Sequence, residues 1–267
     1  MTPTRSRPVL YYELHGKKGP FLLLVHGLLS SRAQWLPNLP SLSTFCRPVV
    51  VELLGHGRSP TPEDPASYTP EAYVEQFQRI RSELGADRWM ICGQSLGAAL
   101  TLRYALDHPG EVIAQVLTNS NSAFAEEGWG TAVRSAMQLQ ARRLESEGRA
   151  WLEESPLNPA RNRHLTPEVR DALIADYALH TPLGVAYTGL YTVPDSSVRG
   201  RIHENEVPAL FMVGEREGRF REHARFAEKT MPHIRVLRLD AGHAVNLDAP
   251  SEFNAAMAKF VSEFAGQ

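Results

Sequence analysis

Short apolar runs alternate with helix-length amphipathic segments along this chain, and this alternation restricts its fold more than any other feature. The pattern is typical of a parallel sheet covered by helices on both faces. The runs expected to form strands are residues 9–14, 21–25, 46–53, 89–93, 112–117, 209–213 and 235–239. The second run is continuously apolar, as expected of a strand buried on both faces. We expect the first two runs to pair as a hairpin that opens the sheet.

Helix signals follow several of these runs. Thr69-Pro70-Glu71 supplies an N-cap, a first-turn proline and a first-turn acid for a helix that ends near Gly85. Further helices are expected over residues 96–107, 219–229 and 250–264. The chain is thus predicted to be an α/β protein with a mostly parallel central sheet.

The strand pattern is interrupted from residue 122 to residue 203, where only helical periodicity remains. Thr166-Pro167 and Thr181-Pro182 are two helix starts in this stretch. Such an insertion predicts a helical cap over the carboxyl ends of the strands, where open α/β sheets bind ligands. We therefore expect a core domain from residues 1–121 and 204–267, with residues 122–203 as a cap, or lid.

Composition narrows the possible partners. The chain has 267 residues, 43% of them hydrophobic and 22% charged, which is typical of a globular protein rather than a disordered one. The net charge of -2 gives no reason to expect a nucleic-acid partner, which would need a clustered basic surface. Two cysteines without metal-ligand spacing indicate a reducing compartment.

The expected location is the cytoplasm. The N-terminus has no apolar signal region, and no stretch approaches the ~20 apolar residues of a membrane span. The expected partner is a small-molecule substrate, with no nucleic acid and no membrane span. The sequence indicates no particular oligomeric state.

Gly93-Gln94-Ser95-Leu96-Gly97 matches the G-x-S-x-G pattern of a nucleophile elbow. It lies where an expected strand ends and an expected helix begins. Side chains at positions 93 and 97 would collide on so sharp a turn, which explains the two glycines. The serine oxygen would stand at the positive end of the following helix. These features predict Ser95 as a catalytic nucleophile.

His243 follows the run 235–239 and precedes the last expected helix, so a loop presents it at the same sheet edge as Ser95. We expect it to take the Ser95 proton and later return it to the leaving group. A carboxylate should orient the imidazole, and the chain order nucleophile, acid, histidine favours Glu217. Glu215 and Asp240 are the alternatives, and Asp240 is disfavoured because it is assigned to the strand before His243.

Acyl transfer also needs N–H donors for the developing oxyanion. The loop His26-Gly27-Leu28 follows the run 21–25, and we expect the N–H groups of Leu28 and Leu96 to form the oxyanion hole. Gly27 permits the close approach of the backbone, and His26 is interpreted as a residue that orders the loop. Cys92 is expected to be a buried strand residue beneath the elbow.

Taken together, the chain resembles the α/β-hydrolase superfamily over essentially its full length. The matching segments are His26-Gly27, Gly55-His56-Gly57-Arg58-Ser59, the elbow around Ser95, Gly214-Glu215-Arg216-Glu217 and Gly242-His243. The resemblance implies the α/β-hydrolase fold and a Ser-acid-His hydrolase that uses no metal and no organic cofactor. It specifies the fold far better than the substrate.

Within that superfamily the chain looks closest to the branch of the menaquinone-pathway 2-succinyl-6-hydroxy-2,4-cyclohexadiene-1-carboxylate synthase and neighbouring C–C bond hydrolases. Residues 214–220 are similar to a Gly-Glu-x-Asp-x-Lys-Phe segment of that branch, with Glu217 in place of the aspartate. The branch also carries an arginine for a substrate carboxylate shortly after the nucleophile. Here that run is Ser95-Leu96-Gly97-Ala98-Ala99, without the arginine, which favours a less acidic substrate.

Three functions follow from these residues. The leading one is hydrolysis of a carboxylic ester, lactone or thioester of a small, largely apolar substrate through an acyl-Ser95 intermediate. The second is a C–C bond hydrolase or lyase in which the Ser-His pair acts as a base. The third, of another class, is a non-catalytic ligand-binding protein on the same scaffold.

Large side chains of the expected cap either line an apolar pocket or pack the cap onto the core, and packing is favoured for any single one. They are Trp129, Met137, Trp151, Tyr177, Tyr187 and Tyr191.

Overall fold

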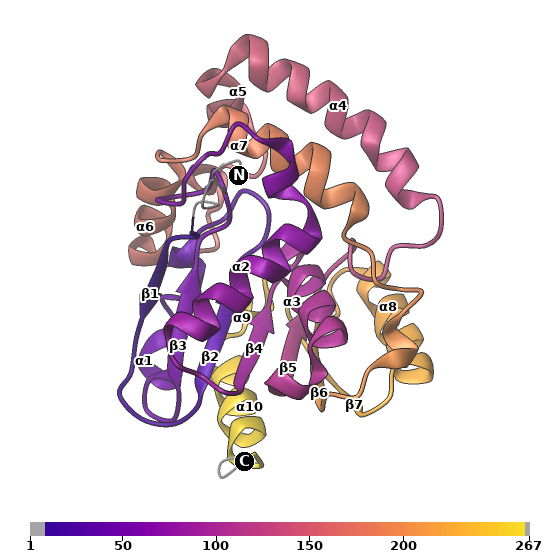
Figure 1. The fold of residues 1–267 in the computed structure, drawn as a ribbon. Helices are drawn as coiled ribbons and strands as arrows, with labels where there is room; N and C mark the ends of the chain where they lie inside the picture. The colour runs from indigo at the N-terminus through magenta and orange to yellow at the C-terminus, as the bar shows by residue number, and fades with distance from the viewer. Residues whose placement is uncertain (1–8, 265–267) are drawn as a thin grey trace, which may run out of the picture.

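A computed structural model describes residues 9–264, and within that range the strands form one seven-stranded sheet (Figure 1). The strand order is β1-β3-β2-β4-β5-β6-β7, and every neighbouring pair is parallel except β1 with β3. The strands are β1 (Tyr12–Leu14), β2 (Phe21–Val25), β3 (Arg47–Val51), β4 (Trp89–Gly93), β5 (Val112–Thr118), β6 (Ala209–Gly214) and β7 (Ile234–Leu239). The predicted fold class, a mostly parallel sheet with helices on both faces, is confirmed.

The predicted hairpin between the first two strands is wrong. β3 lies between β1 and β2, with Tyr12 paired to Val51 on one side and Phe21 paired to Arg47 on the other. β2 is buried along its whole length and therefore needs a hydrogen-bonding partner on each side, whereas the partly exposed β1 suits the sheet edge.

Helices cover both faces of the sheet. Side chains of β2 alternate, so that Leu22 and Leu24 pack with α1 and α10 while Leu23 and Val25 pack with α2 and α3. α8 packs beside α3 on the second of these faces. The helices are α1 (Leu39–Leu42), α2 (Pro70–Glu83), α3 (Leu96–Asp107), α4 (Trp129–Glu147), α5 (Arg149–Glu154), α6 (Pro167–Tyr177), α7 (Pro182–Tyr187), α8 (Gly218–Thr230), α9 (Val245–Asp248) and α10 (Pro250–Ser262).

Helix starts follow the chemistry read from the sequence. The Thr69 hydroxyl accepts a hydrogen bond from the N–H of Ala72 at 3.2 Å and so caps α2, as predicted. The Thr181 hydroxyl accepts in the same way from the N–H of Gly184 at the start of α7. α9, a single turn directly after His243, was not predicted.

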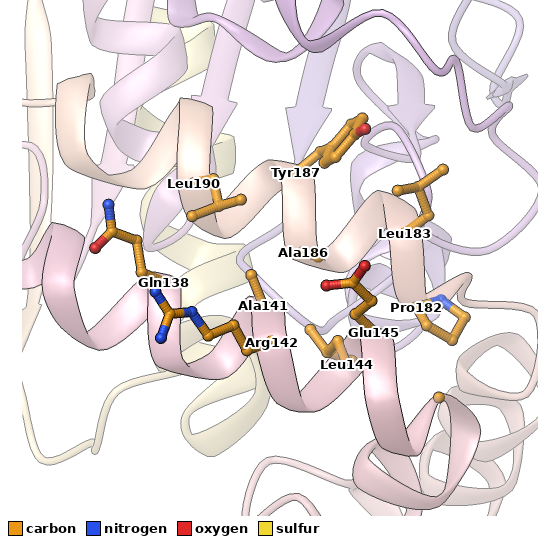
Figure 2. Close-up of a pocket in the computed structure, with 11 residues that line it drawn as sticks. Gln138, Ala141, Arg142, Leu144, Glu145, Pro182, Leu183, Ala186, Tyr187 and Leu190 are labelled. Atoms are coloured by element: carbon orange, nitrogen blue, oxygen red, sulfur yellow. The ribbon is translucent and has the colours of Figure 1, made fainter.

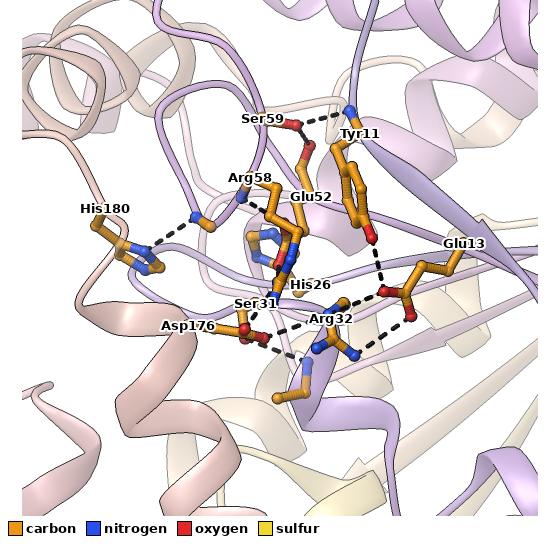
Figure 3. Close-up of polar contacts among 12 residues, drawn as sticks. Tyr11, Glu13, His26, Ser31, Arg32, Glu52, Arg58, Ser59, Asp176 and His180 are labelled. Atoms are coloured by element: carbon orange, nitrogen blue, oxygen red, sulfur yellow. Dashed lines mark hydrogen bonds and ion pairs between the residues drawn. The ribbon is translucent and has the colours of Figure 1, made fainter.

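Residues 122–203 contain α4 to α7, and these helices lie beyond the end of the sheet where β4 runs into α3 (Figure 1). A buried polar network ties this segment to the loops beneath it (Figure 3). Asp176 on α6 is 1% exposed, accepts a hydrogen bond from the Ser31 hydroxyl at 3.0 Å, and pairs with Arg58 at 2.8 Å. Arg32 adds a longer contact at 3.6 Å.

Glu52 forms the other end of this network. It is fully buried, and its carboxylate accepts a hydrogen bond from the backbone N–H of Arg58 at 2.6 Å. Burial raises the pKa of this carboxyl group. Loss of Asp176 would remove the 2.8 Å partner of Arg58 and the hydrogen-bond acceptor of the Ser31 hydroxyl from this largely buried network.

Replacing Asp176 with alanine is therefore expected to lower the free energy of unfolding by about 2 to 4 kcal/mol, with the smaller value reflecting the partial exposure of Arg58. Urea unfolding monitored by circular dichroism would measure the change. Asp171→Ala is the matched control, since Asp171 is an exposed carboxylate on the same helix. Equal stability of the two variants would contradict this account of the network.

Candidate active site

Ser95 lies on a strained turn between β4 and α3. Its backbone angles are φ 55° and ψ -118°, a conformation that residues with a side chain rarely adopt. Gly93 packs against the Gly97 carbonyl and Thr101, and Gly97 packs against the carbonyls of Val25 and His26, so a Cβ at either glycine would collide with these atoms. The sequence pattern therefore folds locally into the sharp turn that it predicts.

The loop after β2 passes directly beside this turn. A Cβ on Gly27 would lie 2.9 Å from the Ser95 Cβ and 2.5 Å from Oε1 of Gln94, so only glycine fits there. Leu29 has φ 58°, and its N–H donates to Nε2 of His56 at 3.1 Å. The N–H of Leu28 thus belongs to a loop held against the serine.

His243 lies on the loop between β7 and α9, with its ring 5.1 Å from that of Phe220. Burial lowers the pKa of the imidazole from its ordinary value, the negative charges of Glu217 and Asp248 raise it, and Arg219 lowers it. The ring is therefore neutral near pH 7 and able to accept a proton. Within residues 9–264 its Nδ1 has no hydrogen-bond partner.

Glu217 lies at the N-terminal end of α8, near His243 but paired elsewhere. Its carboxylate forms an ion pair with Arg219, and the two side chains are 33% and 57% exposed. Glu215 pairs with Arg238 at 3.5 Å. Of the three acids considered from the sequence, only Glu217 has a charge that acts on the pKa of His243.

Asp240, the other alternative, is directed into solvent. It follows β7 rather than belonging to it, because the strand ends at Leu239. Its carboxylate is highly exposed and pairs with Arg216 at 2.9 Å.

Asn119, which sequence reasoning did not single out, connects the three loops of the site. It follows β5 directly, and its backbone carbonyl accepts from the N–H of Ser95 at 3.2 Å. Its side-chain amide donates to the carbonyls of Gly214 and Gly242 at 3.1 and 2.9 Å and accepts from the N–H of Gly214 at 3.1 Å. The sequence feature that could indicate this role of Asn119 is its position as a polar residue directly after an apolar strand.

A cavity of about 360 Å³ lies over the serine. Ser95, His243, Gly27 and Leu28 line it from the side of the sheet, and residues of 122–203, including Tyr177, line it from the other side. Glu217 and Leu96 are not among its lining residues. The structure thus brings the predicted nucleophile, base and loop glycine to one cavity.

The arrangement matches a known family. A family model described as the alpha/beta hydrolase fold covers residues 20–250. The chain belongs to the α/β-hydrolase fold family. This α/β-hydrolase is accordingly a hydrolytic enzyme in its general type, and the resemblance stated from the sequence is confirmed.

The relatives that the chain is similar to include a putative synthase and a carboxylesterase. A putative 2-succinyl-6-hydroxy-2,4-cyclohexadiene-1-carboxylate synthase of Bacillus subtilis is 26% identical and covers 91% of this chain and 89% of its own length. A carboxylesterase of the same organism is also 26% identical, over 92% of this chain and 81% of its own. The solved structure of MenH from S. aureus superposes with a TM-score of 0.82 at 18% identity, covering 95% of this chain and 98% of that one.

A larger hollow of about 660 Å³ lies between α4 and α7 of this α/β-hydrolase (Figure 2). Arg142 and Glu145 lie at its wall among apolar side chains such as Leu183 and Leu190. Within the described residues it shares no lining residue with the cavity over Ser95, and no histidine, serine or cysteine lines it. Ser95 and His243 both line the smaller cavity.

The large side chains predicted in residues 122–203 mostly pack. Trp129, Met137, Tyr187 and Tyr191 contact the main core, and Trp151 packs with Tyr177 beneath α4. Of these six, only Tyr177 lines the cavity over Ser95, and its hydroxyl donates to the Leu152 carbonyl.

Other potential reactive groups are inert or dispersed. Cys92 is fully buried in β4, and burial raises the pKa of its thiol, as expected for a structural cysteine. Within residues 9–264 no three His, Cys, Asp or Glu side chains are arranged to hold a metal ion. In the same range no helix has the length and apolar character needed to cross a bilayer.

Three buried histidines lie together, with the ring of His56 5.5 Å from that of His26 and 4.8 Å from that of His180. Figure 3 shows His26 and His180. Each accepts a hydrogen bond from a backbone N–H: His26 from Leu53, His56 from Leu29, and His180 from Gly57, at 3.0 to 3.1 Å. Burial lowers the pKa of His26 to about 3 and that of His56 to about 4. All three rings therefore serve as neutral acceptors that order these loops.

These pKa values predict that the protein loses stability on acidification. The unfolded chain binds protons on histidine near pH 6.5, whereas folded His26 and His56 stay neutral until about pH 3 and 4. The unfolded state thus takes up more protons, and each histidine should lower the free energy of unfolding by about 1.4 kcal/mol per pH unit below pH 6.5. Urea unfolding at pH 7, 6 and 5 would measure the slope.

His56→Gln should make this slope shallower by about 1.4 kcal/mol per pH unit, the contribution of one proton. His203→Gln, at an exposed histidine, should leave the slope unchanged. A free energy of unfolding that stays constant from pH 7 to pH 5 would refute the assignment of neutral buried histidines.

Proposed function

We propose that this α/β-hydrolase cleaves a carboxylic ester, lactone or thioester of a small, largely apolar substrate through an acyl-Ser95 intermediate. The observation that carries the proposal is the shared cavity: Ser95 on its strained turn, neutral His243 and the Gly27–Leu28 backbone all line it. A nucleophile, a base and oxyanion donors are the parts that acyl transfer requires.

In the proposed mechanism the Ser95 oxygen attacks the scissile carbonyl while its proton passes to His243. The oxyanion is stabilised by the N–H groups of Leu28 and Leu96, since Leu96 is the first residue of α3 and its N–H has no intrahelical acceptor. The tetrahedral intermediate formed by this attack then collapses and expels the alcohol or thiol, which takes the proton from His243. Water then attacks the acyl-enzyme with His243 again as base, releasing the acid and regenerating Ser95.

Glu217 is proposed as the third member of the triad. An imidazolium forms at His243 during each half-reaction, and the Glu217 carboxylate is the acid that can turn toward Nδ1 of that ring. Moving the Glu217 carboxylate away from Arg219 costs little free energy, because an ion pair this exposed is worth roughly 0 to 1 kcal/mol. Asn119 holds the Gly214 and Gly242 backbones together and so sets the spacing of the two loops.

The relatives suggest two reactions, and the lining of the cavity supports ester hydrolysis over the C–C alternative. One relative is a putative synthase of the menaquinone-type branch, which implies a C–C bond reaction with an acidic substrate, and another is a carboxylesterase. Among residues 9–264 no arginine or lysine lines the cavity, so none of these residues would supply a counter-charge to a carboxylate on the substrate. Ester hydrolysis releases an alcohol, whereas C–C cleavage releases an acid and a ketone, so product analysis separates the two.

Ser95→Ala is expected to lower kcat on p-nitrophenyl butyrate by about 10⁴- to 10⁶-fold, because the covalent intermediate can no longer form. Ser146→Ala, at an exposed serine of α4, is the matched control and should keep wild-type kinetics. Near-normal turnover by purified Ser95→Ala protein would exclude the acyl-serine mechanism.

Glu217→Gln is expected to lower kcat by about 10²- to 10⁴-fold, since the imidazolium loses its counter-charge. It should also move the acid limb of kcat/KM to lower pH, because the Glu217 charge raises the pKa of His243. Arg219→Gln should move that limb to higher pH, because Arg219 lowers the same pKa.

The control is Glu215→Gln, which should leave kcat within about twofold, since Glu215 pairs with Arg238. A large loss of kcat in Glu215→Gln or Asp240→Asn, with Glu217→Gln near normal, would reassign the acid.

A further inference from the structure

Asp248 closes the loop that carries His243. It is the last residue of α9, the single turn directly after that loop, and its backbone N–H donates to the Ala244 carbonyl at 2.9 Å. Its carboxylate oxygen Oδ2 accepts a hydrogen bond from the backbone N–H of Gly242 at 2.7 Å. A hydrogen bond from a backbone N–H to a carboxylate is roughly twice as strong as one between neutral groups. Residues 242–248 therefore form a closed turn that includes the proposed base.

The backbone that leads into His243 is held on both sides of Gly242. The Gly242 N–H donates to Asp248, and the Gly242 carbonyl accepts from the side-chain amide of Asn119 at 2.9 Å. A Cβ on Gly242 would lie 2.7 Å from Oδ2 of Asp248, so the carboxylate packs directly against the residue before the base.

α9 gives Asp248 a fixed support. Asn246, fully buried in the same turn, donates from its side chain to the Gln34 carbonyl at 2.9 Å and to Oδ1 of Asn38 at 3.2 Å. The Asn38 side chain donates in return to the Asn246 carbonyl at 3.1 Å. These contacts attach α9 to the segment that precedes α1. Asp248 therefore holds Gly242 relative to the core of the protein.

The charged groups that act on His243 come from two elements. Glu217 and Arg219 lie at the start of α8, and Asp248 lies in α9. Burial lowers the pKa of the imidazole most, Glu217 raises it, Arg219 lowers it, and Asp248 raises it. Asp248 differs from the other two because it also bonds to the backbone next to the base.

We infer that Asp248 is a positioning residue for His243. Its carboxylate holds the backbone ahead of the imidazole and places a second negative charge near the imidazolium that forms in each half-reaction. Asp248 is not among the residues of 9–264 that line the cavity over Ser95, so it acts through His243 and not on the substrate. The inference rests on the proposed function, because it concerns the base of that reaction. Asp248 adds to the role of Glu217 and does not replace it.

Asp248→Ala removes both the hydrogen-bond acceptor and the charge. It should lower kcat on p-nitrophenyl butyrate by about tenfold and leave KM within about twofold, since a displaced catalytic group costs rate rather than binding. Asp248→Asn keeps an oxygen acceptor for the Gly242 N–H and should restore kcat to within about threefold of wild type. Its acid limb of kcat/KM should move to lower pH, because a charge that raises the pKa of His243 is lost.

The matched control is Asp240→Asn, which also removes an aspartate charge near the end of β7. Asp240 is exposed and pairs with Arg216 at 2.9 Å, so this variant should change neither kcat nor the acid limb.

Fluorophosphonate labelling followed by intact-mass spectrometry separates positioning from a structural role, and it needs no ester. All of the Asp248→Ala protein should finally be labelled at Ser95, but about tenfold more slowly than wild type. A lower final labelled fraction, with a wild-type rate, would show that Asp248 only maintains the fold and would overturn the inference. Wild-type kcat and labelling rate in Asp248→Ala, or an acid limb of Asp248→Asn that coincides with that of wild type, would overturn it as well.

The inference and the proposed function fail separately. If wild type hydrolyses no ester but is labelled at Ser95, ester hydrolysis is wrong, and the labelling rate of Asp248→Ala still decides the role of Asp248. If wild type is not labelled, the nucleophile assignment fails, and an NMR titration of the histidine ring signals decides. The His243 signal, assigned with His243→Gln, should titrate at lower pH in Asp248→Asn than in wild type, and an unchanged titration would overturn the inference.

Discussion

The close approach of three backbone segments around Ser95 is the constraint on which the rest of the site depends. Gly93 and Gly97 let β4 reverse into α3, and Gly27 lets the loop after β2 press against the Ser95 side chain. A Cβ at Gly93 or Gly97 would collide with backbone atoms, and a Cβ at Gly27 would collide with the side chains of Gln94 and Ser95. Because β2 and β4 are neighbours in the sheet, this packing holds the loop of Gly27 against Ser95. In the proposed mechanism the strain at Ser95 is part of the preorganisation that acyl transfer needs.

Around this centre the loops are ordered by neutral buried histidines and by an ion-pair network whose three residues do not line the cavity. The buried histidines accept backbone N–H groups as neutral rings, and the Glu52–Arg58–Asp176 network ties α6 to the loops beneath it. Asn119, also neutral, links the carbonyls of the acid and histidine loops to the backbone of the elbow. Among residues 9–264 no arginine or lysine lines the cavity, which suits the neutral substrate that we propose.

Local chemistry in the sequence was enough to predict most of the fold. The apolar run of β4, the glycines of the elbow and the Thr69 cap of α2 act within a few residues, so their outcome is visible from the sequence. The predicted hairpin is wrong because strand order depends on contacts between distant parts of the chain. β3 lies between β1 and β2 and pairs with the backbone hydrogen-bonding groups of the fully buried β2. The roles of Asn119 and His180 were likewise out of reach, since their partners lie far along the chain. Chain order and the similarity of residues 214–220 to the menaquinone-type segment both favour Glu217 as the acid, but neither can show its pairing with Arg219.

The central claim is that Ser95 is an activated nucleophile. Intact-mass spectrometry after exposure to a fluorophosphonate, with peptide mapping of the adduct, tests it most directly. The account predicts a single phosphonyl adduct on the peptide that carries Ser95, formed faster as pH rises through the pKa of His243. Absence of an adduct on folded protein, or an adduct on another residue, would contradict it.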